Sequence, residues 1–200
     1  MNISKRTRLA LLVCFISLSS TVNAHSRAHI HIYESATEQT DAEKLSRAVD
    51  YFQSGKFHEA LIWFSKLDSK YKLNPRFQAY MGVCCYYDGE YERAVATLEP
   101  ILTKLNVFAP HELAVYYYCV AESYFRLKKY IDAVFEKHTL LCYNNEKGDS
   151  LLRIGMCYKH MRDIENAQEY FIEALAYYRR YNNQDKLNYI ERELKRLADN

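Results

Sequence analysis

The strongest constraint on the fold is a pattern of small and apolar residues that recurs along the chain. The pattern is clearest in residues 80–101, where Gly82 lies among apolar residues, Asp88 and Gly89 mark a turn, and Ala94 belongs to a second apolar stripe. Apolar residues spaced three or four apart lie on one face of a helix, and Asp-Gly is typical of a tight turn. The stretch therefore predicts a helix, a turn and a second helix.

The same pattern occurs in four copies. Ala60 and Ala94 are separated by the same interval as Ala133 and Ala167, whereas Ala94 and Ala133 lie slightly further apart. The preceding helices also carry one small residue each: Ala48, Gly82, Ala121 and Gly155. Small residues let two helices approach closely, and each hairpin then leaves an apolar face that the next hairpin covers. The spacing therefore predicts an all-α chain with one continuous core.

This helix–turn–helix unit resembles the tetratricopeptide repeat (TPR), whose units span about 34 residues, the interval between the paired alanines. The resemblance covers about 140 of the 200 residues. It implies a right-handed superhelical solenoid of four repeats, at about 41–74, 75–108, 114–147 and 148–181. The sequence departs from the family at Lys137, which replaces an aromatic residue of the second helix, and at Pro100, which is predicted to bend a helix.

Residues 182–200 are predicted to form a capping helix. One face of this segment carries apolar residues at helical spacing: Leu187, Ile190, Leu194 and Leu197. An amphipathic helix of this kind covers the last apolar face of a solenoid. Near the other end, Thr40 and Glu43 have the spacing of a capping box, which predicts that the first helix begins at Asp41.

The first 24 residues have the features of a secretory signal peptide. Lys5, Arg6 and Arg8 precede an apolar run at 9–18, and Ala24 ends a stretch suited to cleavage. The apolar run is too short to span a bilayer. We therefore expect an exported protein, periplasmic in a bacterium or otherwise secreted, with no transmembrane span in the mature chain. An uncleaved signal anchor is the alternative.

The charge of the mature chain is close to neutral. Cleavage removes three cations from the 27 Lys and Arg, which leaves 24 against 25 Asp and Glu. A near-neutral chain without a basic stripe argues against nucleic acid as a partner.

Residues 25–40 lack a helical period and are predicted to form a flexible tail that contains His25, His29 and His31. Cleavage after Ala24 makes His25 the new N-terminus, and its amine and imidazole nitrogens are ligands that copper prefers. A periplasmic metal-binding protein that uses this tail is therefore one alternative function. The opposing interpretation is that these histidines are incidental.

In TPR proteins, as the resemblance implies, the first helix of each unit lines a concave groove. Helical geometry places the groove stripe about a quarter-turn from the core face. The candidate groove residues are Phe52, Arg76, Val83, Tyr86, Tyr87, Val115, Tyr118, Glu122, Phe125, Arg126, Leu152, Met156, Lys159 and His160. Tyr and Phe offer large, rigid contact surfaces, so this mixture suits a peptide segment or an amphipathic helix. The alternative is that these side chains pack against neighbouring units.

No catalytic constellation accompanies the repeats. Residues 148–151 spell the Gly-Asp-Ser-Leu motif of the GDSL esterases, but no Asp-x-x-His pair follows Ser150. All five Gly lie at repeat positions, so no glycine-rich loop remains for a cofactor, and none is expected. We therefore expect a non-catalytic scaffold or adaptor that binds a peptide or protein segment. A self-associating envelope assembly factor, acting as a homo-oligomer, is the second alternative.

Five cysteines follow the signal peptide, and an odd number leaves at least one thiol unpaired. Most of them lie at apolar helix positions, which is typical of buried free thiols. A bridge between Cys84 and Cys119 is the alternative.

Overall fold

The structure is a computed structural model that describes residues 39–143 and 147–199. The chain divides into two units, Met1–Glu43 and Lys44–Asn200. The predicted signal peptide and the part of the predicted tail that carries His25, His29 and His31 lie outside the described residues. In the described part of the first unit, Thr40 and Glu43 form the predicted capping box. The Thr40 N–H donates to Glu43 Oε2 at 2.8 Å, and the Glu43 N–H donates to Thr40 Oγ1 at 3.2 Å.

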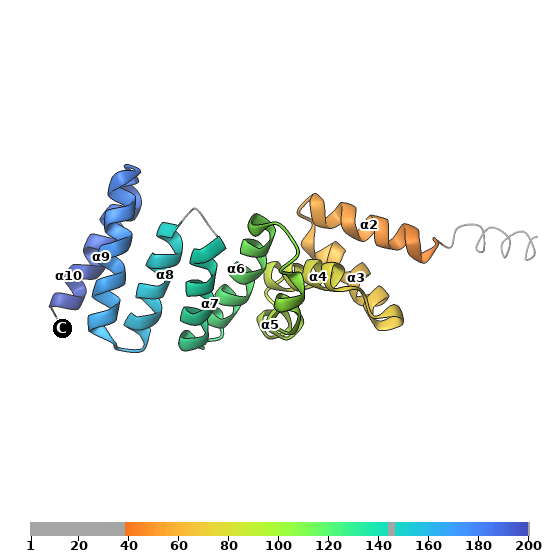
Figure 1. Cartoon of the computed structure of the whole chain (residues 1–200), viewed down its shortest axis with the longest axis horizontal. Helices are drawn as coiled ribbons and strands as arrows, with labels where there is room; N and C mark the ends of the chain where they lie inside the picture. The colour runs from red at the N-terminus through yellow and green to blue at the C-terminus, as the bar shows by residue number, and fades with distance from the viewer. Residues whose placement is uncertain (1–38, 144–146, 200) are drawn as a thin grey trace, which may run out of the picture. The chain divides into compact units, whose positions relative to one another are not determined.

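All regular structure in the described residues is helical, which confirms the all-α prediction. The helices are α2 (Asp41–Gln53), α3 (Phe57–Tyr71), α4 (Pro75–Tyr87), α5 (Tyr91–Leu98), α6 (Pro110–Arg126), α7 (Tyr130–Tyr143), α8 (Lys147–His160), α9 (Ile164–Arg180) and α10 (Gln184–Ala198). Each helix from α3 to α10 packs against the next, and Figure 1 shows α6 to α9 side by side. This is the predicted solenoid of helical hairpins, with α10 as the capping helix. Among the described residues, no helix is long and apolar enough to cross a bilayer.

The turns repeat in backbone geometry as well as in sequence. Gly55, Gly89, Lys128 and Arg162 all have a positive φ, between 60° and 82°. The intervals between them are the same as those between the repeated alanines. Glycine adopts this conformation at little steric cost, whereas Lys and Arg do so less readily. Each hairpin therefore reverses direction through the same left-handed residue.

The small residues at the repeat positions are all buried: Ala48, Ala60, Gly82, Ala94, Ala121, Ala133, Gly155 and Ala167. A Cβ atom on Gly82 would lie 2.5 Å from Leu98 Cγ, and one on Gly155 would lie 2.7 Å from Phe171 Cδ1. Both distances are well below van der Waals contact, so the neighbouring side chain would have to move. Glycine at these two positions therefore sets how closely the helices of a hairpin approach.

The second hairpin differs from the expected form. Pro100 was predicted to bend a helix, but α5 instead ends at Leu98 and the chain continues as a 3-10 helix, η1 (Glu99–Leu105). Proline lacks an N–H and therefore cannot donate the hydrogen bond that would continue an α-helix. The following helix, α6, begins at Pro110 rather than near residue 114, because proline is well suited to the first helical position.

The described cysteines are free thiols, and Cys84 and Cys119 are both fully buried. Burial raises the pKa of Cys84 to about 12, because the thiolate is poorly solvated there. Four of the five described cysteines are buried and Cys142 is exposed, which agrees with the expectation that most are buried free thiols, and the Cys84–Cys119 bridge is not formed.

Candidate binding site

The groove residues predicted on α2 and α4 differ in exposure. Phe52 is half-buried and stacks on Tyr80, with ring centroids 4.4 Å apart. Val83 is buried in the core, whereas Arg76 is exposed. Two further candidates, Tyr86 and Tyr87, are half-buried and exposed respectively. The ring of Tyr86 meets that of Tyr118 edge-on at 5.9 Å, and Tyr87 stacks on Phe57 at 4.2 Å.

The groove residues predicted on α6 remain partly open to solvent. Val115 and Tyr118 are 44% and 37% exposed, and Arg126 is also exposed. Phe125 is half-buried beneath the guanidinium of Arg153, which lies 4.4 Å from the centre of its ring. Glu122 is an exception because its side chain is buried.

The candidates on α8 range from buried to exposed, with His160 the exposed one. Leu152 is buried and Met156 is half-buried. The Lys159 ammonium forms an ion pair with Glu193 of α10. His160 stacks on Tyr130 of α7, with ring centroids 4.8 Å apart.

A pocket of about 610 Å³ lies between α6, α7, α8 and α10. Four of the predicted groove residues line it: Tyr118, Glu122, Leu152 and Met156. The other lining residues were not predicted, and they are Lys137, Asp149, Arg153, Asp185, Lys186, Tyr189 and Arg192. The volume is within the range of ligand pockets in proteins. We take this pocket as the candidate binding site.

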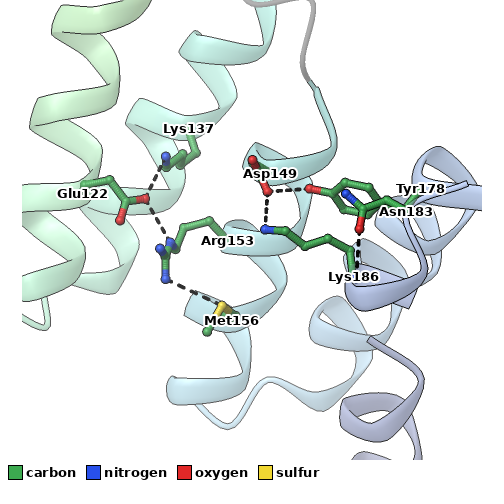
Figure 2. A network of polar contacts seen from close by, with 8 residues as sticks. All are labelled: Glu122, Lys137, Asp149, Arg153, Met156, Tyr178, Asn183 and Lys186. Atoms are coloured by element: carbon green, nitrogen blue, oxygen red, sulfur yellow. Dashed lines mark hydrogen bonds and ion pairs between the residues drawn. The ribbon is translucent and has the colours of Figure 1, made fainter. Parts of the chain in front are cut away.

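A buried ionic cluster forms one side of the pocket (Figure 2). Lys137 Nζ and Arg153 Nε both lie 2.9 Å from the same oxygen, Glu122 Oε1. The side chains of Glu122 and Lys137 are only 3% and 2% exposed. Burial lowers the pKa of Lys137, although the Glu122 carboxylate opposes this effect by favouring the charged ammonium. The cluster joins α6, α7 and α8.

Lys137 occupies the position where the repeat pattern has an aromatic residue. Its ammonium lies 4.4 Å from the centre of the Tyr118 ring, a cation–π contact. Lys137 therefore holds both the buried carboxylate and the pocket-lining tyrosine in place.

A second polar network fixes α10 against α8 and α9 (Figure 2). Asp149 accepts hydrogen bonds from the Tyr178 hydroxyl at 2.5 Å and from Lys186 Nζ at 2.7 Å. Burial alone would raise the pKa of Asp149, but these two bonds hold it below its usual value. Asn183 caps α10 by accepting the Lys186 N–H at 3.2 Å. Ser150, the serine of the esterase-like motif, is buried in the first turns of α8.

A further buried carboxylate lies outside the pocket, on α7. Glu136 is 6% exposed, and its Oε2 atom has no hydrogen-bond partner among the described residues. Burial raises the pKa of Glu136 to about 7, and the negative charges of Glu99 and Asp132 add to the effect. Glu136 therefore titrates near neutral pH in the folded protein.

Only some of the residues that line the pocket could be predicted from the sequence. Lys137 stood out because it breaks the repeat pattern at a position that must be buried. Arg153 gave no such signal, because charged residues on a first helix are common, and Asp149 was noted only as part of the esterase-like motif at 148–151. Lys186 and Arg192 lie on the predicted capping helix, for which only the apolar face was assigned a role.

The fold, with this pocket on the side of the first helices, was compared with known proteins. Residues 148–181 match the model of the tetratricopeptide repeat family. These residues form α8 and α9, the hairpin that supplies Asp149, Leu152, Arg153 and Met156 to the pocket. The chain thus contains a tetratricopeptide repeat, and its fold is that of TPR proteins. No significant match was found among curated protein sequences.

Several solved structures have a similar fold at low sequence identity. The structure of MamA AMB-1 is 13% identical, with a TM-score of 0.59 over 80% of this chain and 92% of that one. A putative kinesin light chain from Podosopora anserina with nearly identical TPR-like repeats is 14% identical, with a TM-score of 0.57 over 82% and 88%. The apo form of RapI is 15% identical, with a TM-score of 0.61 over 86% of this chain and 55% of its own. At this identity the likeness concerns the fold.

Proposed function

We propose that the protein is a non-catalytic scaffold that binds a peptide or protein segment at the pocket between α6, α7, α8 and α10. A solenoid of helical hairpins is an arrangement that suits protein–protein interaction. The observation that carries the proposal is the pocket itself, whose walls are fixed by the Glu122 cluster and by the Asp149–Lys186 ion pair. A preorganised pocket loses little conformational freedom when a partner binds.

Aromatic and aliphatic side chains extend the candidate site beyond the pocket. Tyr87, Val115 and Tyr118 are 54%, 44% and 37% exposed, and they lie on the neighbouring helices α4 and α6. Partly exposed tyrosines provide large contact areas at a small entropic cost and are frequent energetic centres of interfaces. A peptide anchored in the pocket gains additional contact area by extending over this surface.

Replacing Tyr118 with Ala is expected to weaken peptide binding by about tenfold or more, the effect of losing a central interface aromatic. The probe is a random library of 12-residue peptides with free C-termini, from which binders are selected with the unaltered protein. Affinities of the selected peptides are then measured by fluorescence anisotropy for both proteins.

Phe135→Ala is the matched control, because Phe135 is 70% exposed on α7 and does not line the pocket. Equal losses from both substitutions would show that binding is unspecific adhesion to exposed aromatic rings. Failure to select any peptide above background would contradict the proposed peptide-binding function.

We also propose that the protein is exported and that residues 1–24 are removed. The support is the sequence pattern of a short apolar run after three cations, which ends in small residues. The expected result is that protein isolated from the native cell envelope or medium begins at His25, as N-terminal sequencing measures. Protein that retains Met1 or that remains in the cytosolic fraction would overturn this proposal.

A further inference from the structure

One face of α7 carries apolar side chains that are open to solvent. Its residues have the spacing of a single helical stripe, and all are exposed: Ile131, Phe135, His138 and Cys142. Ile131 and Phe135 are 63% and 70% exposed. Single exposed apolar residues are ordinary, but several on one face mark an interaction surface. None of the four lines the pocket, so Phe135 remains a control for binding there.

The helix α9 adds carboxylates to this region. Glu165, Glu169 and Glu173 are spaced four residues apart and exposed, so they form an acidic row along one face of the helix. Ile172 lies on the same face and is 57% exposed. The sequence has no Lys, Arg or His from residue 163 to residue 178, so no cation of this stretch balances the acidic row.

A contact between His138 and Tyr170 joins the two faces. The Tyr170 hydroxyl lies 3.0 Å from His138 Nε2, and the centres of the two rings are 5.5 Å apart. Burial raises the pKa of Tyr170, and the charges of Glu173 and Glu169 add to the effect, which places both carboxylates close to this contact. The apolar stripe of α7 and the acidic row of α9 therefore belong to one surface. We call it the α7–α9 surface, and its residues are Ile131, Phe135, Glu165, Glu169, Ile172 and Glu173.

The chemistry of the α7–α9 surface defines what fits it. Apolar residues at helical spacing pack well against the apolar stripe of another helix. The stripe from Ile131 to Cys142 is about 16 Å long, which matches three turns of a partner helix. Carboxylates beside the stripe favour Lys and Arg on that helix and repel acidic proteins, nucleic acids and anionic lipids. A basic amphipathic helix combines both features.

We infer that the α7–α9 surface binds a basic amphipathic helix of a partner protein. The apolar stripe of that helix packs on Ile131, Phe135 and Ile172, and its cations face the acidic row of α9. The inference does not depend on the proposed function, because the α7–α9 surface and the pocket share no residue. A scaffold with both sites holds two ligands at once.

The probe is a helical peptide of about 14 residues, or four turns, made only of Leu and Lys with Leu on one face. Two variants of the probe test the chemistry. One has Glu in place of Lys, and the other has the same composition in an order that spreads Leu around the helix. Binding to the whole protein is measured by fluorescence anisotropy at low and at physiological salt. We expect the probe to bind at least tenfold more tightly than either variant, and more weakly at the higher salt concentration.

Two double substitutions in the protein separate the two contributions. Glu165→Gln/Glu169→Gln removes two charges of the acidic row, so it is expected to weaken the probe at least fivefold at low salt and to reduce the salt dependence. Ile131→Ala/Ile172→Ala removes apolar contact area, so it is expected to weaken the probe at least fivefold at both salt concentrations. All four residues are exposed, so both proteins should keep the circular dichroism signal and the melting temperature of the unaltered chain.

The controls remove the same kinds of group elsewhere. Glu59→Gln/Glu92→Gln takes two exposed carboxylates from α3 and α5. Ile62→Ala/Val107→Ala takes two aliphatic side chains, 42% and 85% exposed, that lie outside the α7–α9 surface. Neither control should change the affinity for the probe by more than about twofold, the effect of substitutions outside an interface.

Three results would overturn the inference, and none of them affects the proposed function at the pocket. Equally tight binding of the acidic peptide would refute charge complementarity. Equal losses in the double variants and in their controls would place the probe elsewhere on the protein. A dimer that is detected by sedimentation equilibrium and that Ile131→Ala/Ile172→Ala dissociates would show that a second copy of the chain covers the surface.

Discussion

Replacing Lys137 with Met is expected to lower the free energy of unfolding by about 3 kcal/mol, near the lower end of the range for breaking a buried ion pair. Lys137 and Glu122 are both almost completely buried, and their charged atoms lie 2.9 Å apart. Without the ammonium, the carboxylate stays buried with Arg153 as its remaining cation. Urea denaturation followed by circular dichroism at pH 7 measures the change.

Lys104→Met is the matched control, since Lys104 is an exposed lysine of η1, and it should change stability by less than about 0.5 kcal/mol. The double substitution Glu122→Leu/Lys137→Met should recover most of the loss, because it removes the buried carboxylate together with its partner. A loss below about 1 kcal/mol in the single variant would show that the cluster contributes little to stability.

Replacing Glu136 with Gln is expected to stabilise the protein at pH 8.5 by up to about 3 kcal/mol and to have little effect at pH 4.5. The pKa of Glu136 is about 7 in the folded protein, above its ordinary value of 4.5. The folded state therefore binds more protons than the unfolded state between these two values. This contribution to stability is complete below pH 4.5 and is lost as the pH rises through 7. Gln mimics the protonated carboxyl group and removes the dependence.

The measurement is a pair of urea denaturation series from pH 4.5 to 8.5, one for each protein. The difference in free energy of unfolding between them should grow with pH and level off above about pH 8. Glu173→Gln, at an exposed position on α9, serves as the control and should shift both ends of the series equally. A difference that stays constant with pH would mean that Glu136 is ionised throughout.

The fold was predictable because it depends on spacing. Helical hairpins that recur at a regular interval require small residues at fixed positions, and those positions are visible as Gly82, Gly155 and the repeated alanines. The details of the second hairpin were harder to predict from the sequence. Pro100 was correctly recognised as a disturbance, but a proline is compatible both with a bent α-helix and with a change to a 3-10 helix. In the observed 3-10 helix Ile101, Leu102 and Leu105 are buried, and this tertiary packing is not visible in the local sequence.

The candidate site was predictable only on its α6 and α8 sides. Successive residues of an α-helix are rotated by 100°, so the sequence shows which residues of one helix share a face. This placed Tyr118 and Met156 on the pocket side. The same geometry placed Glu122 on the groove side but could not identify its partner, because Lys137 comes from the second helix of the hairpin. To predict that Arg192 lines the pocket, one must know how α10 packs against α8 and α9. The spacing of side chains within one helix does not specify that packing.

The Glu122 cluster also favours the correct pairing of neighbouring hairpins when the chain folds. Hairpins that share one apolar pattern are nearly interchangeable as neighbours, and repeat proteins are prone to misassembly for that reason. Glu122 and Lys137 belong to one hairpin, and Arg153 belongs to the next. A misplaced neighbour would leave the buried pair without its guanidinium, whereas apolar contacts alone would tolerate the exchange. The cluster thus makes the native pairing of these two hairpins more stable than a pairing with another hairpin of similar shape.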